Sequence, residues 1–222
     1  MRKKKNVLVA AALVAAAALT LSACGGSDTP AKSGNQPLVE APPTKTKAAT
    51  VLDRPYTKPN LVLKDTNGKE YDLREATKGK PTLIYFGYTH CPDVCPLTMS
   101  NIAAAYKKLP KADQEKLRVV FVTTDPERDT PKELGKWLKG SGNADFIGLT
   151  GDFPTIQAGA RQLGVSIEPS TTDKDGNVTS MHTKQVIAFS PKNDSGYLLY
   201  TDQASADDYT ADLPKIVKGE TP

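Results

Sequence analysis

Hydrophobic and polar residues alternate along the chain in blocks that are typical of strands followed by helices. Short apolar runs, rich in the β-branched and aromatic residues that suit buried strands, occupy residues 61–63, 71–73, 82–86, 117–123, 146–149, 185–189 and 197–200. Apolar residues at helical spacing predict helices over residues 97–109, 131–140, 154–163 and 205–217, and Pro214 could kink or end the last one. The first two runs are joined by a turn and predict an N-terminal hairpin. The whole pattern predicts an α/β fold in which helices flank a mixed sheet.

The stretch KPTLIYFGYTHCPDVCPLTMSNI, residues 80–102, joins the central strand to a helix and carries two cysteines. Proline has no N–H and is tolerated in a helix mainly in its first turn, so Pro96 places Cys95 at or just before a helix N-terminus. The positive end of the helix dipole favours thiolate over thiol at such a position. A strand followed by a CxxxC motif and a helix places the chain in the thioredoxin-like group.

The spacing of Cys91 and Cys95 leaves their chemistry open. Positions i and i+4 are neighbours on a helix, so the two sulfurs can form a disulfide or bind one soft metal ion as thiolates. Three residues separate the cysteines, whereas the thioredoxin redox motif has two. Spacing alone does not choose between a disulfide and a metal site, and the plainest interpretation is a structural disulfide in an exported protein.

Residues 1–23 have the features of an export signal, with a basic start, an apolar Ala-rich core and small residues at the end. The ending L-S-A-C resembles the lipobox of bacterial lipoproteins, in which the cysteine, here Cys24, is lipidated and becomes the first residue. The alternatives are an uncleaved anchor helix or an ordinary signal with a chance cysteine. Residues 24–55 are polar and predict a flexible tether before one domain, residues 56–222. We therefore expect a lipid anchor in the cell membrane, with the domain on its extracytoplasmic face.

An export signal changes what the net charge and the cysteine count imply for the rest of the chain. The four basic residues in the signal account for the whole formal charge of +4, so the chain from Cys24 onwards is formally neutral. Nucleic-acid binding relies on clustered Lys and Arg, and no such excess remains. If Cys24 carries lipid, Cys91 and Cys95 are the only cysteines left, and they lie in an oxidising compartment.

The two histidines are candidates for a metal site. His90 adjoins Cys91 and as a cation would stabilise a neighbouring thiolate, although a solvent-facing loop residue is the simpler interpretation. His182 precedes the strand at residues 185–189, and loops at the strand ends of such a sheet can reach the cysteine helix. Two thiolates and one imidazole suit copper, because thiolates hold Cu(I) and imidazole extends the site to Cu(II), whereas zinc normally requires a fourth ligand. Taken alone, His182 would more often be a surface or capping residue.

The motifs FGYTHCPDVCPLT and TTDPERDTP, followed by a late histidine, resemble the Sco (SenC) family. Members of this family are copper-binding proteins with a thioredoxin fold that help to assemble cytochrome c oxidase. The resemblance implies that Cys91, Cys95 and His182 are copper ligands. It also maps the family's aspartate-arginine segment onto residues 125–130, which a capped helix entrance explains in part. Family members commonly have an aspartate before the histidine, whereas this chain has Met181, which becomes a candidate soft auxiliary ligand.

Two classes of function remain open for the domain. The resemblance implies a copper metallochaperone, rather than an enzyme, whose partners are the copper-bearing subunit of cytochrome c oxidase and other copper chaperones. The alternative is a thiol–disulfide oxidoreductase that reduces the cysteines of an apo-metalloprotein through Cys91 and Cys95. A redox signalling role would use the same residues, whereas the paired cysteines do not have the arrangement expected of a peroxidase. His182 separates the two classes, because a simple dithiol exchanger does not need it.

Overall fold

The computed structural model describes residues 48–176, 178–181 and 183–222, which belong to a unit that spans Lys45–Pro222. The predicted signal segment, Cys24, most of the predicted tether and His182 lie outside the described residues. Within the described part of the chain, no helix combines the length and the apolar character needed to cross a membrane.

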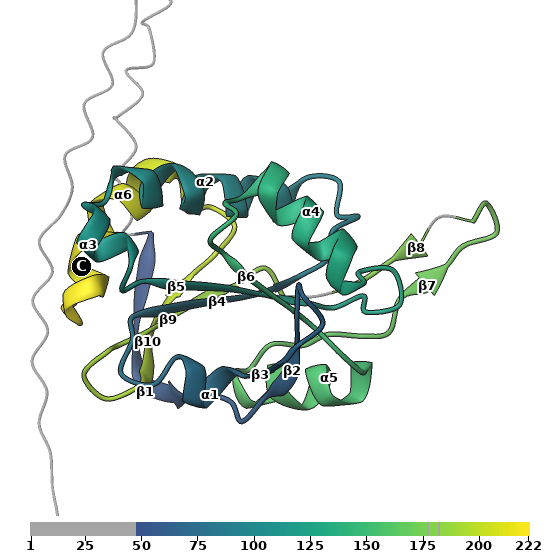
Figure 1. Ribbon diagram of the computed structural model, residues 1–222, viewed down its shortest axis with the longest axis horizontal. Coiled ribbons are helices and arrows are strands. Elements are labelled where there is room, and N and C mark those ends of the chain that lie inside the picture. The colour runs from purple at the N-terminus through teal and green to yellow at the C-terminus, as the bar shows by residue number, and fades with distance from the viewer. Residues whose placement is uncertain (1–47, 177, 182) are drawn as a thin grey trace, which may run out of the picture. The chain divides into compact units, whose positions relative to one another are not determined.

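A mixed sheet of eight strands forms the centre of the described region, in the order β1-β10-β9-β4-β5-β6-β2-β3 (Figure 1). The strands are β1 (Ala49–Thr57), β2 (Val62–Asp65), β3 (Glu70–Asp72), β4 (Thr82–Gly87), β5 (Arg118–Thr123), β6 (Ile147–Thr150), β9 (Val186–Phe189) and β10 (Ser195–Tyr200). The strands β4, β5 and β6 run parallel, and the other neighbouring pairs are antiparallel. The predicted mixed α/β fold is confirmed, as is the N-terminal hairpin, which β2 and β3 form.

Helices cover both faces of this sheet (Figure 1). They are α1 (Leu73–Ala76), α2 (Val94–Lys108), α3 (Lys111–Gln114), α4 (Pro131–Ser141), α5 (Phe153–Gln162) and α6 (Ala206–Lys218). The helices α2, α3, α4 and α6 lie over one face, while α1 and α5 lie over the other. The predicted start of α4 is confirmed, because Thr130 caps it and Pro131 is its first residue. The helix α6 continues through Pro214, so this proline does not end it.

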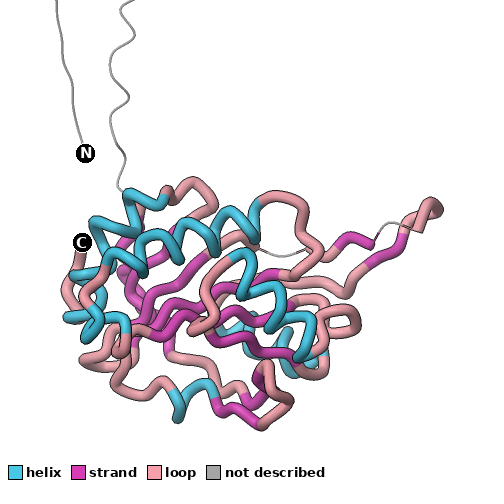
Figure 2. The backbone as a smooth tube through the Cα atoms, turned by 45° about the horizontal axis from the view of Figure 1, so that its top comes forward, coloured by secondary structure: helices cyan, strands magenta, loops and turns pink. Residues whose placement is uncertain are grey.

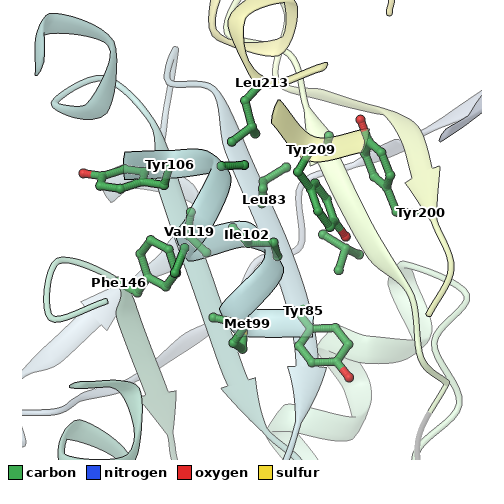
Figure 3. Packing of buried hydrophobic residues seen from close by; sticks show 14 of the residues in the cluster. Leu83, Tyr85, Met99, Ile102, Tyr106, Val119, Phe146, Tyr200, Tyr209 and Leu213 are labelled. Carbon is green, nitrogen blue, oxygen red and sulfur yellow. The ribbon is translucent and has the colours of Figure 1, made fainter. Parts of the chain in front are cut away.

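The alternating side chains of β4 enter two separate apolar layers. Leu83 and Tyr85 pack with residues such as Met99 of α2 (Figure 3), whereas Ile84 and Phe86 belong to the layer on the opposite face of the sheet. Each of these five side chains is at most 1% exposed. Burying a side chain of this size typically stabilises a fold by about 2 kcal/mol. Both layers therefore hold β4 rigidly, up to the point where the cysteine motif begins.

The strand β1 was not predicted and lies partly within the stretch that we expected to be the tether. It begins at Ala49 and pairs with β10 at the edge of the sheet, with an irregularity between Val51 and Tyr56. Most of its side chains are exposed, and Pro55 is tolerated because an edge strand has a free side. A strand with so few buried residues lacks the apolar alternation by which a strand is recognised in a sequence.

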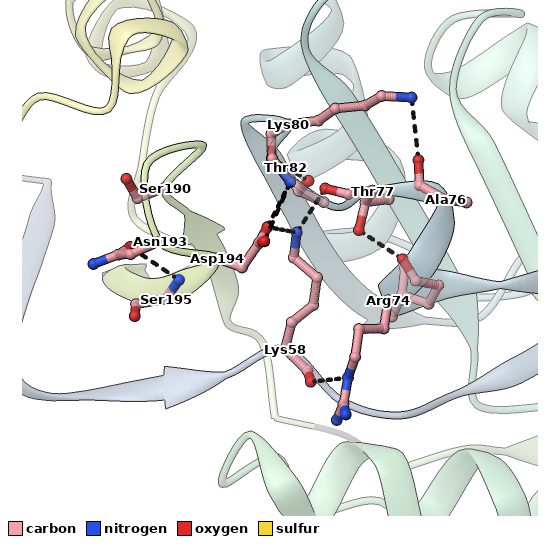
Figure 4. A network of polar contacts seen from close by, with 12 residues as sticks. Lys58, Arg74, Ala76, Thr77, Lys80, Thr82, Ser190, Asn193, Asp194 and Ser195 are labelled. Carbon is pink, nitrogen blue, oxygen red and sulfur yellow. Dashed lines mark hydrogen bonds and ion pairs between the residues drawn. The ribbon is translucent and has the colours of Figure 1, made fainter.

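The residue that follows β1 is tied into the domain by polar contacts (Figure 4). Lys58 is 1% exposed, and its Nζ donates hydrogen bonds to the carbonyl oxygen of Thr77 at 2.8 Å and to Oδ1 of Asp194 at 2.7 Å. Asp194 lies in the β9–β10 turn with a positive φ of 57° and also accepts a hydrogen bond from the N–H of Gly79. Burial lowers the pKa of Lys58, while its ion pair with Asp194 counteracts the shift. We call Lys58, Thr77, Gly79 and Asp194 the Lys58 network.

A short two-stranded ribbon, β7 (Thr171–Thr172) and β8 (Val178–Thr179), extends away from the central sheet (Figures 1 and 2). It corresponds to the polar excursion between α5 and β9 in the sequence. Its side chains are mostly exposed, so it adds little to either apolar layer. The chain returns from β8 into the segment that leads to β9.

Candidate functional site

The cysteine motif lies at the junction between β4 and α2. The strand ends at Gly87 and the helix begins at Val94, with Asp93 as its N-cap. The Asp93 carboxylate accepts a hydrogen bond from the N–H of Val94 at 2.6 Å. Cys95 is therefore in the first turn of the helix, as the position of Pro96 predicted.

Cys91 and Cys95 are reduced thiols that the structure brings together. The backbone N–H of Cys95 donates to Sγ of Cys91 at 3.4 Å, and the Cys91 thiol points to the Asp93 carboxylate at 3.8 Å. Cys95 is buried with an exposed fraction of 0%, whereas Cys91 is partly exposed. The pair therefore presents one sulfur to solvent and keeps the other inside the domain.

The expectation that the helix N-terminus would favour a Cys95 thiolate is wrong for the metal-free protein. A hydrogen bond with Cys91 and then burial raise the pKa of the Cys95 thiol, and they outweigh a hydrogen bond from Tyr85 that lowers it. The hydrogen bond with Cys91 favours the neutral thiol, and the removal of the sulfur from water disfavours its charged form. A soft cation that binds Cys95 would have to displace this proton.

Tyr85 is a contact of Cys95 that the sequence analysis did not identify. Its hydroxyl group donates a hydrogen bond to the Cys95 sulfur at 3.4 Å. Burial raises the pKa of Tyr85, so the phenol stays neutral and remains a donor. The alternation of β4 already placed Tyr85 on the same face as Gly87, but only the position of α2 shows that this face meets a cysteine.

Asp129 connects the aspartate-arginine segment to the turn before Cys91. Its carboxylate is 0% exposed and accepts hydrogen bonds from the N–H of Thr89 at 2.9 Å, from the Thr89 hydroxyl at 2.5 Å and from the Thr123 hydroxyl at 2.6 Å. Arg128 pairs instead with Asp125, through its Nε at 2.5 Å. The capped helix entrance predicted here is confirmed. The contact between Asp129 and Thr89, in the turn before Cys91, was not predicted.

His90 lies beside Asp129 rather than buried among the sulfurs. Its Nδ1 is 3.1 Å from the Thr89 hydroxyl and 3.6 Å from Oδ1 of Asp129, and its side chain is 52% exposed. Asp129 thus holds Thr89 through hydrogen bonds, and His90 lies next to this pair through its contact with the Thr89 hydroxyl. This geometry is that of a loop residue held at one ring nitrogen.

His182 lies outside the described residues, but two of its near neighbours in the chain are anchored. Ser180 is 4% exposed, and its hydroxyl lies 3.0 Å from that of Thr124, whose N–H donates to the carbonyl oxygen of Gly87. Thr183 donates its N–H to the carbonyl oxygen of Ser166 at 3.1 Å. Met181, the candidate auxiliary ligand, has a side chain that is 68% exposed. Among the residues that the structure describes, no three His, Cys, Asp or Glu side chains form a group that could hold a metal ion.

Comparison with known proteins identifies the family. The SCO1/SenC family model matches residues 50–218. A Stutzerimonas stutzeri protein named as copper-binding is 35% identical over 141 residues, which is 64% of this chain and 68% of that protein. The mitochondrial protein SCO2 of Saccharomyces cerevisiae is 32% identical over 126 residues, which is 57% of this chain and only 40% of that protein.

Two solved structures with a similar fold support the same assignment. Copper-bound ScoI of Bradyrhizobium japonicum is 32% identical, has a TM-score of 0.61 and aligns over 73% of this chain and 98% of its own. The apo Sco1 protein of Thermus thermophilus is 31% identical, has a TM-score of 0.66 and aligns over 78% of this chain and 98% of its own. The fold is therefore thioredoxin-like in the manner of these proteins. With the family model matching most of the chain, the cysteine motif at the β4–α2 junction is that of a member of the SCO1/SenC family.

Proposed function

We propose that this protein is an exported copper metallochaperone that binds copper through Cys91, Cys95 and His182. The observation that carries the proposal is the pair of reduced cysteines in contact at the start of α2, one buried and one open to solvent. Two thiolates are the ligands that Cu(I) prefers. The copper-bound structure of the Bradyrhizobium relative, at 32% identity, adds support from within the family.

The recipient that we propose is the copper-bearing subunit of cytochrome c oxidase, with other copper chaperones as further partners. BsSco, a protein of similar fold, is a member of the Sco family of cytochrome c oxidase assembly proteins. We further propose that Cys24 is lipidated and holds the domain at the extracytoplasmic face of the cell membrane. Copper is then cargo that the domain receives and passes on.

Each ligand has a distinct part in this proposal. Cys91 offers an accessible sulfur, and Cys95 completes a two-sulfur set after losing its proton. Imidazole is harder than thiolate and suits Cu(II), so His182 extends the site to the oxidised ion. The contact from Asp129 to Thr89 fixes the turn on which Cys91 is presented.

The second candidate is a thiol–disulfide oxidoreductase, and the unequal exposure of the two sulfurs favours it as well. The Cys91 thiolate would attack a disulfide in a partner, forming a mixed disulfide and releasing one partner thiol. The Cys95 sulfur would then displace the second partner thiol and close the Cys91–Cys95 disulfide. Two electrons pass to the partner in this exchange, and both partner sulfurs leave as thiols.

The variant His182→Ala separates the two candidates. We expect the variant to retain much of its Cu(I) binding, because Cu(I) tolerates two thiolate ligands. We expect it to lose bound Cu(II) and the sulfur-to-Cu(II) charge-transfer absorption, since Cu(II) depends far more on a nitrogen ligand. Oxidase activity in cells should fall, while dithiol–disulfide exchange should persist. Metal titration, visible absorption and a thiol exchange assay measure these effects.

His90→Ala is the matched control, because His90 is the other histidine and its ring is held near Asp129. It should keep both copper states. Oxidation of the domain to the Cys91–Cys95 disulfide should abolish copper binding, since a disulfide has no thiolate to donate. If His182→Ala binds Cu(II) as the parent does, or leaves oxidase assembly unchanged, the three-ligand site is wrong and the oxidoreductase becomes the better interpretation.

A further inference from the structure

The buried sulfur of Cys95 lies against the C-terminal end of β4, next to Tyr85 and Gly87. Alternate residues of a strand share a face, so Leu83, Tyr85 and Gly87 all point toward α2. Leu83 fills the apolar layer, whereas the two residues closer to the cysteine motif meet the Cys95 side chain. Neither Tyr85 nor Gly87 has a role in the proposed function as described so far.

Gly87 leaves the space that the sulfur occupies. A Cβ atom at this position would lie 2.8 Å from Sγ of Cys95, 3.0 Å from a ring carbon of Phe121 and 3.1 Å from one of Tyr85. Real Cβ contacts essentially never come closer than 3.0 Å, so any larger residue would push the sulfur from its place. The glycine is therefore required by the close approach of these side chains and not by its backbone conformation, since its φ is not positive.

Tyr85 supplies a hydrogen bond to the same sulfur. Its ring packs beside Phe121 at 5.9 Å in an edge-on arrangement, which fixes the direction of the phenol. Figure 3 shows Tyr85 at the margin of the packed cluster, with its hydroxyl group turned away from Met99 and Ile102. That hydroxyl donates to Cys95 at 3.4 Å and also has a side-chain hydrogen bond with Thr98, one turn along α2.

We propose that Tyr85 and Gly87 form a sulfur cradle that fixes the place of the Cys95 sulfur and tunes its electron-donating strength. Both are positioning residues, since they act through Cys95. A hydrogen bond to sulfur draws electron density from it and stabilises it more as thiol or thiolate than as a disulfide, which is a weaker acceptor. The effect of the cradle on copper rests on the proposed function, whereas its effect on the Cys91–Cys95 disulfide does not.

Tyr85→Phe removes the donor and keeps the ring. In a dithiothreitol redox buffer, oxidised dithiothreitol takes two electrons and two protons from the dithiol, and we expect the variant to favour its disulfide about fivefold more than the parent does. In the Cu(II) form, a thiolate without this hydrogen bond donates more readily, so the charge-transfer band should move to longer wavelength. Tyr106→Phe is the control, because Tyr106 is a buried tyrosine of the same cluster that donates instead to the carbonyl oxygen of Gln114.

Gly87→Ala tests the steric part of the cradle. We expect Cys95 to react faster with a thiol reagent and Cu(I) affinity to fall at least about tenfold, which is the size of effect typical when the support of a metal ligand is lost. Gly148→Ala is the matched control: its added Cβ would lie 2.7 Å from Leu138, away from both cysteines, so it should lower stability without changing thiol reactivity. The loss of stability from Gly87→Ala should also be smaller in a Cys95→Ala background, where the sulfur is absent.

These outcomes separate the cradle from the proposed function. If the parent binds no copper, the proposed function fails. The disulfide equilibrium of Tyr85→Phe and the stability loss from Gly87→Ala with and without Cys95 still test the cradle. If Tyr85→Phe leaves the disulfide equilibrium at the parent value, the hydrogen-bond part is wrong. Equal stability losses from Gly87→Ala with and without the Cys95 sulfur would overturn the steric part.

Discussion

Asp129 shows how a single buried carboxylate can organise a functional turn. A charge removed from water is costly unless hydrogen bonds replace its hydration. Here the N–H and hydroxyl groups of Thr89 and the hydroxyl group of Thr123 supply three donors to a side chain that is 0% exposed. Because Thr89 precedes the cysteine motif by two residues, the same bonds determine how Cys91 is presented.

Asp129→Ala should therefore affect both stability and the cysteine turn. We expect a loss of about 3 kcal/mol in the free energy of unfolding, since three donors lose a buried acceptor. Asp129→Asn should cost less than half of that, because its amide can accept two of the bonds and donate to the Thr89 hydroxyl. Urea unfolding measures both values, and the rate at which Cys91 reacts with a thiol reagent should rise in the alanine variant. Equal stability of the two variants would contradict this account.

The sequence predicts residues of this site when local rules determine their position. Pro96 was enough to place Cys95 at the start of a helix, because proline at a helix start is a local effect. Asp129 could not be assigned in this way, because its contacts depend on the parallel register that sets Gly87 beside Thr123. Tyr85 could not be assigned either, because its contact with Cys95 depends on how α2 lies over β4. The hydrogen bond with Cys91 and the burial of the sulfur also reversed the expected effect of the helix dipole on the Cys95 thiol, and both are properties of the folded chain.

At the scale of elements, apolar periodicity predicted the interior of the sheet better than its edge. The two-sided burial of β4 and β5 makes continuous apolar runs, which are clear in a sequence. The edge strand β1 contributes few buried side chains, so its place is set by backbone pairing with β10 and by the Lys58 network. Backbone hydrogen bonds leave no pattern in the side chains, and this is why β1 was not found.

The Lys58 network should hold the end of β1 to the rest of the domain. We expect Lys58→Ala to lower the free energy of unfolding by about 2 kcal/mol, because the carbonyl group of Thr77 loses its partner and Asp194 loses its ion pair. Asp194 keeps the N–H of Gly79 and some contact with water, so the cost stays below that of a fully buried unpaired charge. Lys78→Ala is the control, since Lys78 is exposed beside the same network. Indistinguishable unfolding curves for the two variants would show that the network contributes nothing.

At the scale of the whole molecule, the domain has its own apolar layers on both faces of the sheet. We therefore expect the domain to fold without the segment that precedes it. This separation is what a lipid anchor at Cys24 would need, because the anchor then determines only where the domain is held.

Cys24→Ala should release the protein from membranes without unfolding it. We expect the variant in the soluble fraction after export, with the circular dichroism spectrum and thermal midpoint of the parent domain. Ser22→Gly is the control, because it keeps a small residue before the cysteine and should leave lipidation intact. A Cys24→Ala protein that stays on the membrane after signal cleavage would contradict the anchor.

The unequal exposure of Cys91 and Cys95 also imposes an order of events in time. A partner that approaches from solution can reach the Cys91 sulfur, whereas the Cys95 sulfur lies behind it at 0% exposure. Under the proposed function, copper would arrive through Cys91 and depart through Cys91, with unloading as the reverse of loading. A donor and a recipient cannot both contact the single accessible sulfur, that of Cys91, at the same time. Transfer would then follow a ping-pong sequence, in which the donor leaves before the recipient binds.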